Sequence, residues 1–158
     1  MRRTVYRIHM GKLPKTCCFF GHKEIYGEYN RLLPLLIEKV EQLIQDGFGV
    51  FLFGGYGQFD SMCHDGVRTL KTTHDIKTVY VQAYYKPHDS DMEYLQTKYD
   101  EIIFPEISVP RKFAISRRNQ IMVDMSDLCI FHVTRNYGGA YQTLQYARRK
   151  GRKVLQIK

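Results

Sequence analysis

The sequence repeats one order of three parts: a short apolar run, a glycine-containing loop and a segment in which apolar residues recur at helical spacing. One apolar run ends at Gly21, and a second is followed by Gly54 and Gly55. Wholly apolar strands that alternate with helices are typical of a parallel sheet covered on both faces. The sequence therefore predicts a three-layer α/β fold with a mainly parallel sheet, whose expected strands are 15–20, 48–53, 76–84, 101–104, 128–133 and 153–157.

The expected helices lie between these strands. In the first of them, Leu32, Leu36 and Val40 are among the apolar residues that recur at helical spacing, and Pro34 is tolerable there only near the first turn. Gly47 and Gly151 are helix stops. The predicted helical segments are about 28–46, one that ends near 71, one or two turns at 94–99, 112–124 and 140–150, and residues 86–91 are expected to form a loop.

Length and composition favour one globular domain spanning 1–158, with 44% hydrophobic residues. No apolar run approaches the roughly 18 residues that cross a bilayer, and the basic N-terminus lacks an apolar signal core, so we expect a cytoplasmic protein without a membrane partner. The formal charge of +8 suggests an anionic partner such as a nucleotide, a nucleic acid or a phosphorylated metabolite. Part of this charge, at residues 148–150, has a simpler explanation, because cations suit a helix C-terminus.

The four cysteines do not form a disulfide framework. Cys17 and Cys18 are neighbours in one expected strand and must point to opposite faces, so we interpret them as reduced core residues. No pair has the spacing of a zinc site, and we expect no metal and no cofactor. The expected core comprises Cys17, Phe19, Val50, Leu52, Val79, Val81, Leu128, Ile130 and Leu155.

Three loops at the expected carboxyl ends of strands are candidates for a binding site. In an open parallel sheet, ligands bind at this edge, where loops lead into helix N-termini. Glycine permits close approach of backbone N–H groups to a phosphate, and the helix N-terminus adds partial positive charge. The simpler alternative is that the glycines only form tight turns. The candidate ligand-binding residues of these loops are Gly21, His22 and Lys23, then Gly54, Gly55, Tyr56 and Gly57, and finally Gly138, Gly139 and Ala140.

Asp60 follows the second loop at a spacing that resembles half of a dinucleotide fingerprint. Two interpretations fit this residue. It caps the next helix by accepting backbone N–H groups, which we favour, or it binds a ribose hydroxyl.

A cationic cluster at residues 116–119 is the strongest single candidate, because Arg117 and Arg118 supply planar guanidinium groups that match phosphate or carboxylate. Adjacent helical residues point about 100° apart, so we expect Arg118 to face the cleft with Asn119 while Arg117 points elsewhere. For His22, a bond to a phosphate or a base competes with the plainer role of a satisfied turn residue.

These loops and the arginine cluster, in this order, resemble the SLOG superfamily, which groups the LOG cytokinin-activating enzymes with DprA-like DNA-processing proteins. The resemblance covers about residues 15–157 and is closest to the YpsA-like branch. The motifs that carry it are Cys17-Cys18-Phe19-Phe20-Gly21-His22, Phe53-Gly54-Gly55-Tyr56-Gly57-Gln58-Phe59-Asp60, Arg118-Asn119 with the residues up to Asp127, and Gly138-Gly139-Ala140 with Tyr146-Ala147 downstream.

The resemblance implies a Rossmann-like domain that holds a nucleotide or a nucleotide derivative between the two glycine loops and the arginine-bearing helix. It also implies a homodimer or larger homo-oligomer. LOG enzymes hydrolyse a ribose–base bond with an arginine and a glutamate, and these positions correspond here to Arg118 and Gln145. Neutral Gln145 neither stabilises positive charge on the sugar nor acts as a base, so the LOG reaction is not expected in its usual form.

Three functions remain open from the sequence. The leading hypothesis is a module that binds a nucleotide-derived small molecule, of the ADP-ribose or cyclic-nucleotide type, for sensing or sequestration. The second is an enzyme that cleaves an N-glycosidic bond with Asp60, Asp124 or Glu24 in place of the missing glutamate. The third is a DprA-like nucleic-acid-binding module, which is less favoured because no strand pair interleaves aromatic and basic residues.

Overall fold

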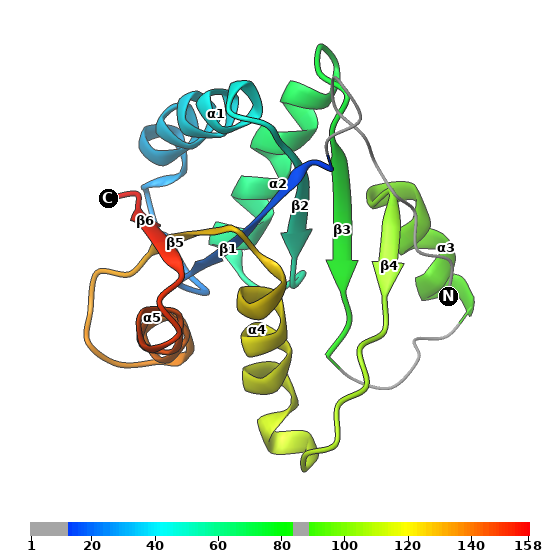
Figure 1. The fold of residues 1–158 in the computed structure, drawn as a ribbon, viewed down its shortest axis with the longest axis vertical. Helices are drawn as coiled ribbons and strands as arrows, with labels where there is room; N and C mark the ends of the chain where they lie inside the picture. Colours follow the sequence, from blue (N-terminus) through cyan, green and yellow to red (C-terminus); the bar gives the residue numbers. More distant parts are fainter. Residues whose placement is uncertain (1–12, 84–88) are drawn as a thin grey trace.

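The computed structural model describes residues 13–83 and 89–158, which form an α/β fold around one parallel sheet (Figure 1). The strand order is β4-β3-β2-β1-β5-β6, and every neighbouring pair of these described strands is parallel. The strands are β1 (Lys15–Gly21), β2 (Phe48–Phe53), β3 (Lys77–Val81), β4 (Glu101–Ile103), β5 (Leu128–His132) and β6 (Lys153–Gln156). The predicted fold class is confirmed.

Helices cover both faces of this sheet. The helical elements are α1 (Tyr29–Gln45), α2 (Gln58–Lys71), α3 (Asp89–Lys98), the short 3-10 helix η1 (Arg111–Phe113), α4 (Ala114–Met125) and α5 (Gly139–Arg149). One core cluster joins α1 and α2 to the sheet through residues such as Leu36 and Met62. A second cluster joins α4 and α5 to the opposite face through Met122 and Leu144.

The two adjacent cysteines of β1 show this division directly. Cys17 belongs to the cluster under α1 and α2, whereas Cys18 belongs to the cluster under α4 and α5. Their side chains therefore point to opposite faces, as the strand period requires. All four cysteines lie within the described residues and are free and buried.

Several expected details differ from the structure. Val50, Leu128 and Leu155 are half-buried residues packed against the two core clusters rather than fully buried. Pro34 lies inside α1, beyond its first turn. It is exposed, so water can satisfy the carbonyl group that loses its helical partner.

The region between β3 and β4 was the least accurate part of the prediction. β3 ends at Val81 rather than at residue 84, and α3 starts at Asp89, within the stretch expected to be a loop. Residues 84–88 lie outside the described residues. α3 has weak amphipathic character, with Leu95 packed against the core, and this explains why helical spacing did not reveal its full length.

None of the described helices combines the length and apolar character needed to cross a membrane. Within the same residues, no group of three or more His, Cys, Asp or Glu side chains has the arrangement of a metal site.

Candidate functional site

The candidate site is a cavity of about 170 Å³ at the carboxyl ends of the central strands. β1 pairs with β2 on one side and with β5 on the other. Strands β2 to β4 therefore extend the sheet in one direction from β1, and β5 and β6 extend it in the opposite direction. Such a switch point is where open α/β sheets bind ligands. The lining residues are Phe19, Phe20, Gly21, His22, Lys23, Gly54, Tyr56, Asp60, Ile115, Arg118, Asn119, Arg135, Gly139 and Ala140.

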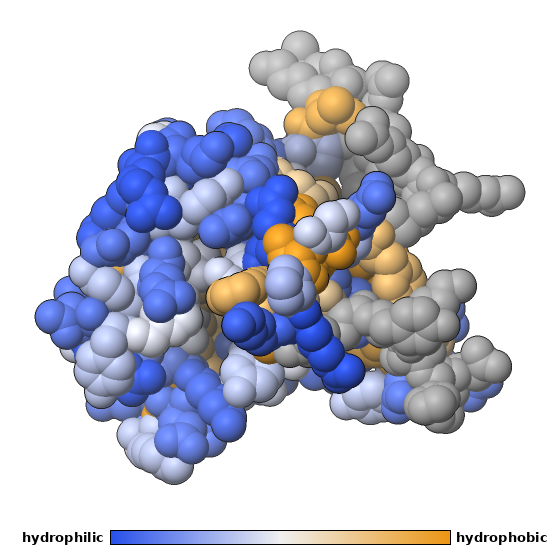
Figure 2. All heavy atoms as spheres, turned by 90° about the horizontal axis from the view of Figure 1, so that it is seen from below, coloured by the Kyte–Doolittle hydropathy of each residue, from blue (hydrophilic) through white to orange (hydrophobic). Residues whose placement is uncertain are grey.

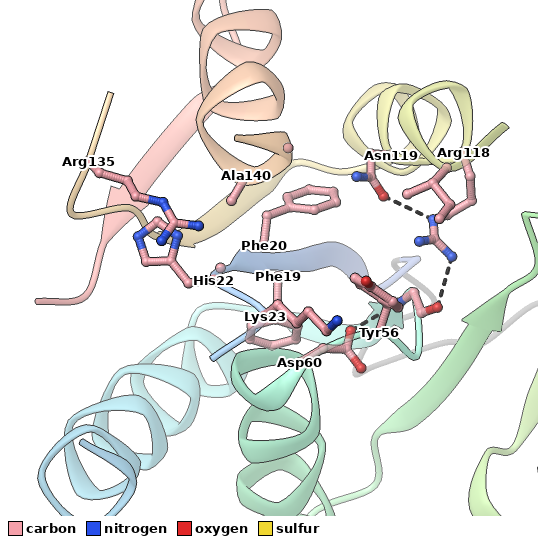
Figure 3. A pocket seen from close by; sticks show the side chains of 14 residues that line it. Phe19, Phe20, His22, Lys23, Tyr56, Asp60, Arg118, Asn119, Arg135 and Ala140 are labelled. Atoms are coloured by element: carbon pink, nitrogen blue, oxygen red, sulfur yellow. Dashed lines mark hydrogen bonds between the residues drawn. The ribbon is translucent and has the colours of Figure 1, made fainter. Parts of the chain in front are cut away.

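Most of the residues selected from the sequence meet at this cavity. Gly55, Gly57 and Gly138 are the exceptions, because they do not line it. Their φ angles of 72°, 96° and 94° are positive, so these three glycines fit the tight-turn interpretation. Figure 3 shows Lys23, Tyr56 and Asp60 across the cavity from Ala140 at the start of α5.

Asp60 organises the loop that follows β2. Its two carboxylate oxygens accept the backbone N–H groups of Gly54 and Gly55, each at 3.1 Å. The expectation that Asp60 caps the next helix is wrong, because it lies inside α2 and the capping position is Gly57, without a side-chain hydrogen bond. The carboxylate therefore accepts N–H groups of the loop before α2 rather than those of the helix itself.

The environment of Asp60 changes its acidity. Burial raises the pKa of this carboxyl group from 3.8 to about 6, although the Gly54 N–H group and the Arg118 guanidinium act in the opposite direction. Asp60 thus ionises much closer to neutral pH than an exposed aspartate does.

Arg118 is 4% exposed and holds the same loop from α4. Its Nη1 donates to the carbonyl oxygens of Gly54 at 2.8 Å and Val81 at 3.1 Å. As expected, Arg118 lines the cavity while Arg117 does not; Arg117 donates to Gln120 on its own helix. The buried guanidinium group therefore supports the wall of the cavity as well as adding positive charge to it.

A chain of hydrogen bonds continues from Arg118 to the second glycine loop. Nε of Arg118 donates to Oδ1 of Asn119 at 2.9 Å, and Nδ2 of Asn119 donates to Oγ1 of Thr143 at 3.4 Å. Thr143 then donates to the carbonyl oxygen of Gly139 at 2.9 Å. The two loops on either side of the cavity are thereby connected through α4 and α5.

His22 combines both roles considered from the sequence. Its Nε2 accepts the backbone N–H of Thr134 at 2.9 Å, so the neutral ring carries its proton on Nδ1. Burial, together with Arg135 and His132, lowers the pKa of His22. The ring is a satisfied turn residue that also lines the cavity.

Sequence reasoning missed four lining residues, namely Phe19, Phe20, Ile115 and Arg135. Phe19 and Phe20 immediately precede Gly21 and point to opposite faces of β1, so the strand end exposes parts of both to the cavity. Arg135 was detectable as a cation in the loop before α5. Figure 3 places its guanidinium beside His22.

The residues considered for N-glycosidic cleavage do not assemble. Gln145 lines a separate polar hollow between α4 and α5, and its Nε2 donates to the hydroxyl of Tyr141. Asp124 accepts the hydroxyl of Tyr146, and neither Asp124 nor Glu24 lines the cavity. Of the three carboxylates considered, Asp60 alone lines it.

Comparison with solved structures identifies the fold. DNA processing protein A (DprA) from Streptococcus pneumoniae superposes with a TM-score of 0.66 at 18% identity, over 90% of this chain and 50% of that one. DprA from Helicobacter pylori, studied for its single-stranded DNA binding mode, superposes with a TM-score of 0.62 at 13% identity, over 90% of this chain and 65% of that one. The described chain has a DprA-like Rossmann fold.

TM1055 also superposes, with a TM-score of 0.61 at 13% identity, over 89% of this chain and 72% of that one. The DprA-like fold is the one that the SLOG resemblance implied. This chain spans half to two thirds of the two DprA structures. No family model and no curated protein matches the sequence.

Proposed function

We propose that the cavity binds the phosphate-bearing part of a nucleotide or nucleotide derivative, in the manner of a YpsA-like SLOG module for sensing or sequestration. The observation that carries this proposal is the position of Gly139 and Ala140. They begin α5 opposite Gly54 and Lys23, in one cavity at the switch point of the sheet. Two glycine loops thus face the same space.

Electrostatics support an anionic ligand. Among the described residues, those that line the cavity and carry charge are Lys23, Arg118, Arg135 and Asp60, so cations outnumber carboxylates there. The first N–H groups of α5 have no acceptor within the helix, and Gly138 provides no side-chain cap. These N–H groups and the helix dipole favour a phosphate at this end.

Binding accounts for the site better than hydrolysis does. Both oxygens of Asp60 already accept backbone N–H groups, and Gln145 lies in another hollow. N-glycosidic cleavage remains an alternative that depends on Asp60, whose raised pKa would suit a general acid.

Titration calorimetry with ribose 5-phosphate, AMP, cyclic AMP and ADP-ribose tests this proposal. We expect at least one of them to bind, and the double variant Lys23→Ala/Arg135→Ala to weaken that binding by roughly tenfold or more. Arg117→Ala is the matched control, since Arg117 does not line the cavity. If none binds, or if the double variant binds as the wild type does, the proposal is wrong. Chromatography for a released base, with NAD included, detects hydrolysis.

A second candidate is binding of single-stranded nucleic acid. Three exposed rings at the carboxyl edge each lie under a cation. Two are on loops, with Tyr56 under Lys23 at 5.7 Å and Tyr137 under Arg135 at 4.7 Å, and in η1 Phe113 lies under Lys112 at 5.0 Å. Bases stack on such rings, while the cations contact the backbone. These pairs come from two loops and from η1, so no strand motif signalled them.

Figure 2 looks onto this edge and shows apolar side chains beside strongly hydrophilic ones. Fluorescence anisotropy with labelled oligo(dT), at several salt concentrations, tests nucleic-acid binding. We expect affinity to fall steeply with salt and to fall in Tyr137→Ala and Phe113→Ala. Affinity that is unchanged in both variants would contradict this candidate.

The homodimer or larger assembly implied by the SLOG resemblance stays a prediction. Sedimentation velocity of the purified protein tests it directly.

A further inference from the structure

The enclosed space of the cavity is small compared with that of pockets that surround a whole ligand. Its volume is about 170 Å³, whereas pockets that enclose drug-sized ligands measure roughly 300–1,000 Å³. A phosphate and part of a sugar fit between the two glycine loops. The base of a bound nucleotide must then lie at the mouth of the cavity, on residues that are accessible to water.

Among the described residues that line the cavity, Tyr56 is the aromatic residue with a large exposed fraction. Its side chain lines the cavity although the residue is 56% exposed, and Nζ of Lys23 lies 5.7 Å from the ring centroid. Phe19 and Phe20 also line the cavity, but they are buried in the two core clusters and offer little accessible surface. Figure 3 shows Tyr56 beside Lys23, across the cavity from Ala140.

The backbone around Tyr56 is well fixed. The N–H of Gln58 donates to the carbonyl of Lys23 at 2.7 Å, and Oε1 of Gln58 accepts the N–H of Ile25 at 2.7 Å. These two bonds tie the loop after β2 to the loop after β1. A ring on a fixed loop loses little conformational freedom when a ligand binds against it.

We propose that the Tyr56 ring stacks on the base of a mononucleotide whose phosphate lies in the cavity. This inference rests on the proposed function and specifies its ligand class. Stacking uses the π-face that every base presents, so the subsite accepts purines and pyrimidines alike. It distinguishes nucleotides from sugar phosphates, which lack a planar base.

The test compares AMP with ribose 5-phosphate by titration calorimetry. In the wild type, we expect AMP to bind about tenfold more tightly or better, because only AMP stacks. Tyr56→Ala should bring the ratio of AMP affinity to ribose 5-phosphate affinity close to one, because it removes the ring on which only AMP stacks. Tyr56→Phe should keep the ratio, because it keeps the ring. CMP and GMP should behave as AMP does.

Tyr26→Ala is the matched control. Tyr26 is a 76% exposed tyrosine near Lys23 in the chain, but it does not line the cavity, so this variant should keep the wild-type ratio. If ribose 5-phosphate binds, and the ratio of AMP affinity to ribose 5-phosphate affinity is the same in Tyr56→Ala as in the wild type, the stacking subsite is wrong but the phosphate site is not contradicted. If neither ligand binds the wild type, this subsite fails, whereas the proposed function fails only if cyclic AMP and ADP-ribose do not bind either. The inference is also overturned if Tyr26→Ala lowers this affinity ratio as much as Tyr56→Ala does.

Discussion

Asp60 and Arg118 hold one residue, Gly54, from its two sides: the carboxylate accepts its N–H and the guanidinium donates to its carbonyl oxygen. Asp60 comes from α2 and Arg118 from α4, which cover opposite faces of the sheet. The loop between β2 and α2 is therefore fixed by both layers. This double attachment gives the candidate cavity a rigid wall.

Replacing Arg118 should destabilise the fold as well as the site. Arg118→Ala leaves the carbonyl groups of Gly54 and Val81 without a buried donor, and removes the cation near Asp60. We expect the free energy of unfolding, measured with urea, to fall by about 2–4 kcal/mol. Arg117→Ala should change it by less than about 0.5 kcal/mol. Equal stabilities for the two variants would show that Arg118 is not structural.

The raised pKa of Asp60 predicts a distinctive pH dependence of stability. The folded pKa of about 6 exceeds the ordinary value of 3.8, so between these pH values the folded state binds the extra proton. The contribution of Asp60 to the free energy of unfolding therefore falls as pH rises from about 4 to about 6, by up to about 3 kcal/mol. Urea unfolding of wild type and Asp60→Asn across this range should give curves that diverge. Parallel curves would indicate an ordinary carboxyl group.

Two glycines of the cavity should respond differently to substitution. A Cβ atom on Gly139 meets nothing within 4 Å, so Gly139→Val should fold but fill the space next to the α5 N-terminus. We expect its phosphate-ligand affinity, measured by calorimetry, to drop roughly tenfold or more. A Cβ atom on Gly21 would lie 2.3 Å from Cγ of buried Phe59, so Gly21→Ala should lose about 1–3 kcal/mol of stability instead. Normal binding by Gly139→Val would remove α5 from the site.

Asn119 and Thr143 should be energetically coupled, because their hydrogen bond links α4 to α5. A double-mutant cycle of Asn119→Ala and Thr143→Val, followed by thermal or urea unfolding, should give a coupling energy of about 0.5–1 kcal/mol. Thr78→Val provides the control cycle with Asn119→Ala, since Thr78 bonds to Asp100 instead. Additivity in both cycles would mean that the bond at 3.4 Å contributes nothing to stability.

Much of the fold was predictable because the strands are short, apolar and separated by clear glycine stops. β1, β2 and β5 were located to within a residue at each end, because each contains an apolar run bounded by glycine or polar residues. α3 was not, because it buries little apolar surface and leaves a weak pattern. The gathering of candidate residues at one edge also followed from the sequence, because parallel strands place the loops after them on the same side.

Local sequence patterns are sufficient to predict the parallel sheet, the opposite orientations of Cys17 and Cys18, and the edge that holds the glycine loops, because these features depend on apolar runs and on the strand period. The hydrogen-bond partners of Asp60 and Arg118 depend on the folded chain, because Gly54 and Val81 lie on other elements that folding brings to these side chains. The tertiary structure also separated Gln145 from the cavity. Gln145 lies more than one turn beyond Gly139, and a helix rotates by about 100° per residue, so its side chain leaves α5 on another face.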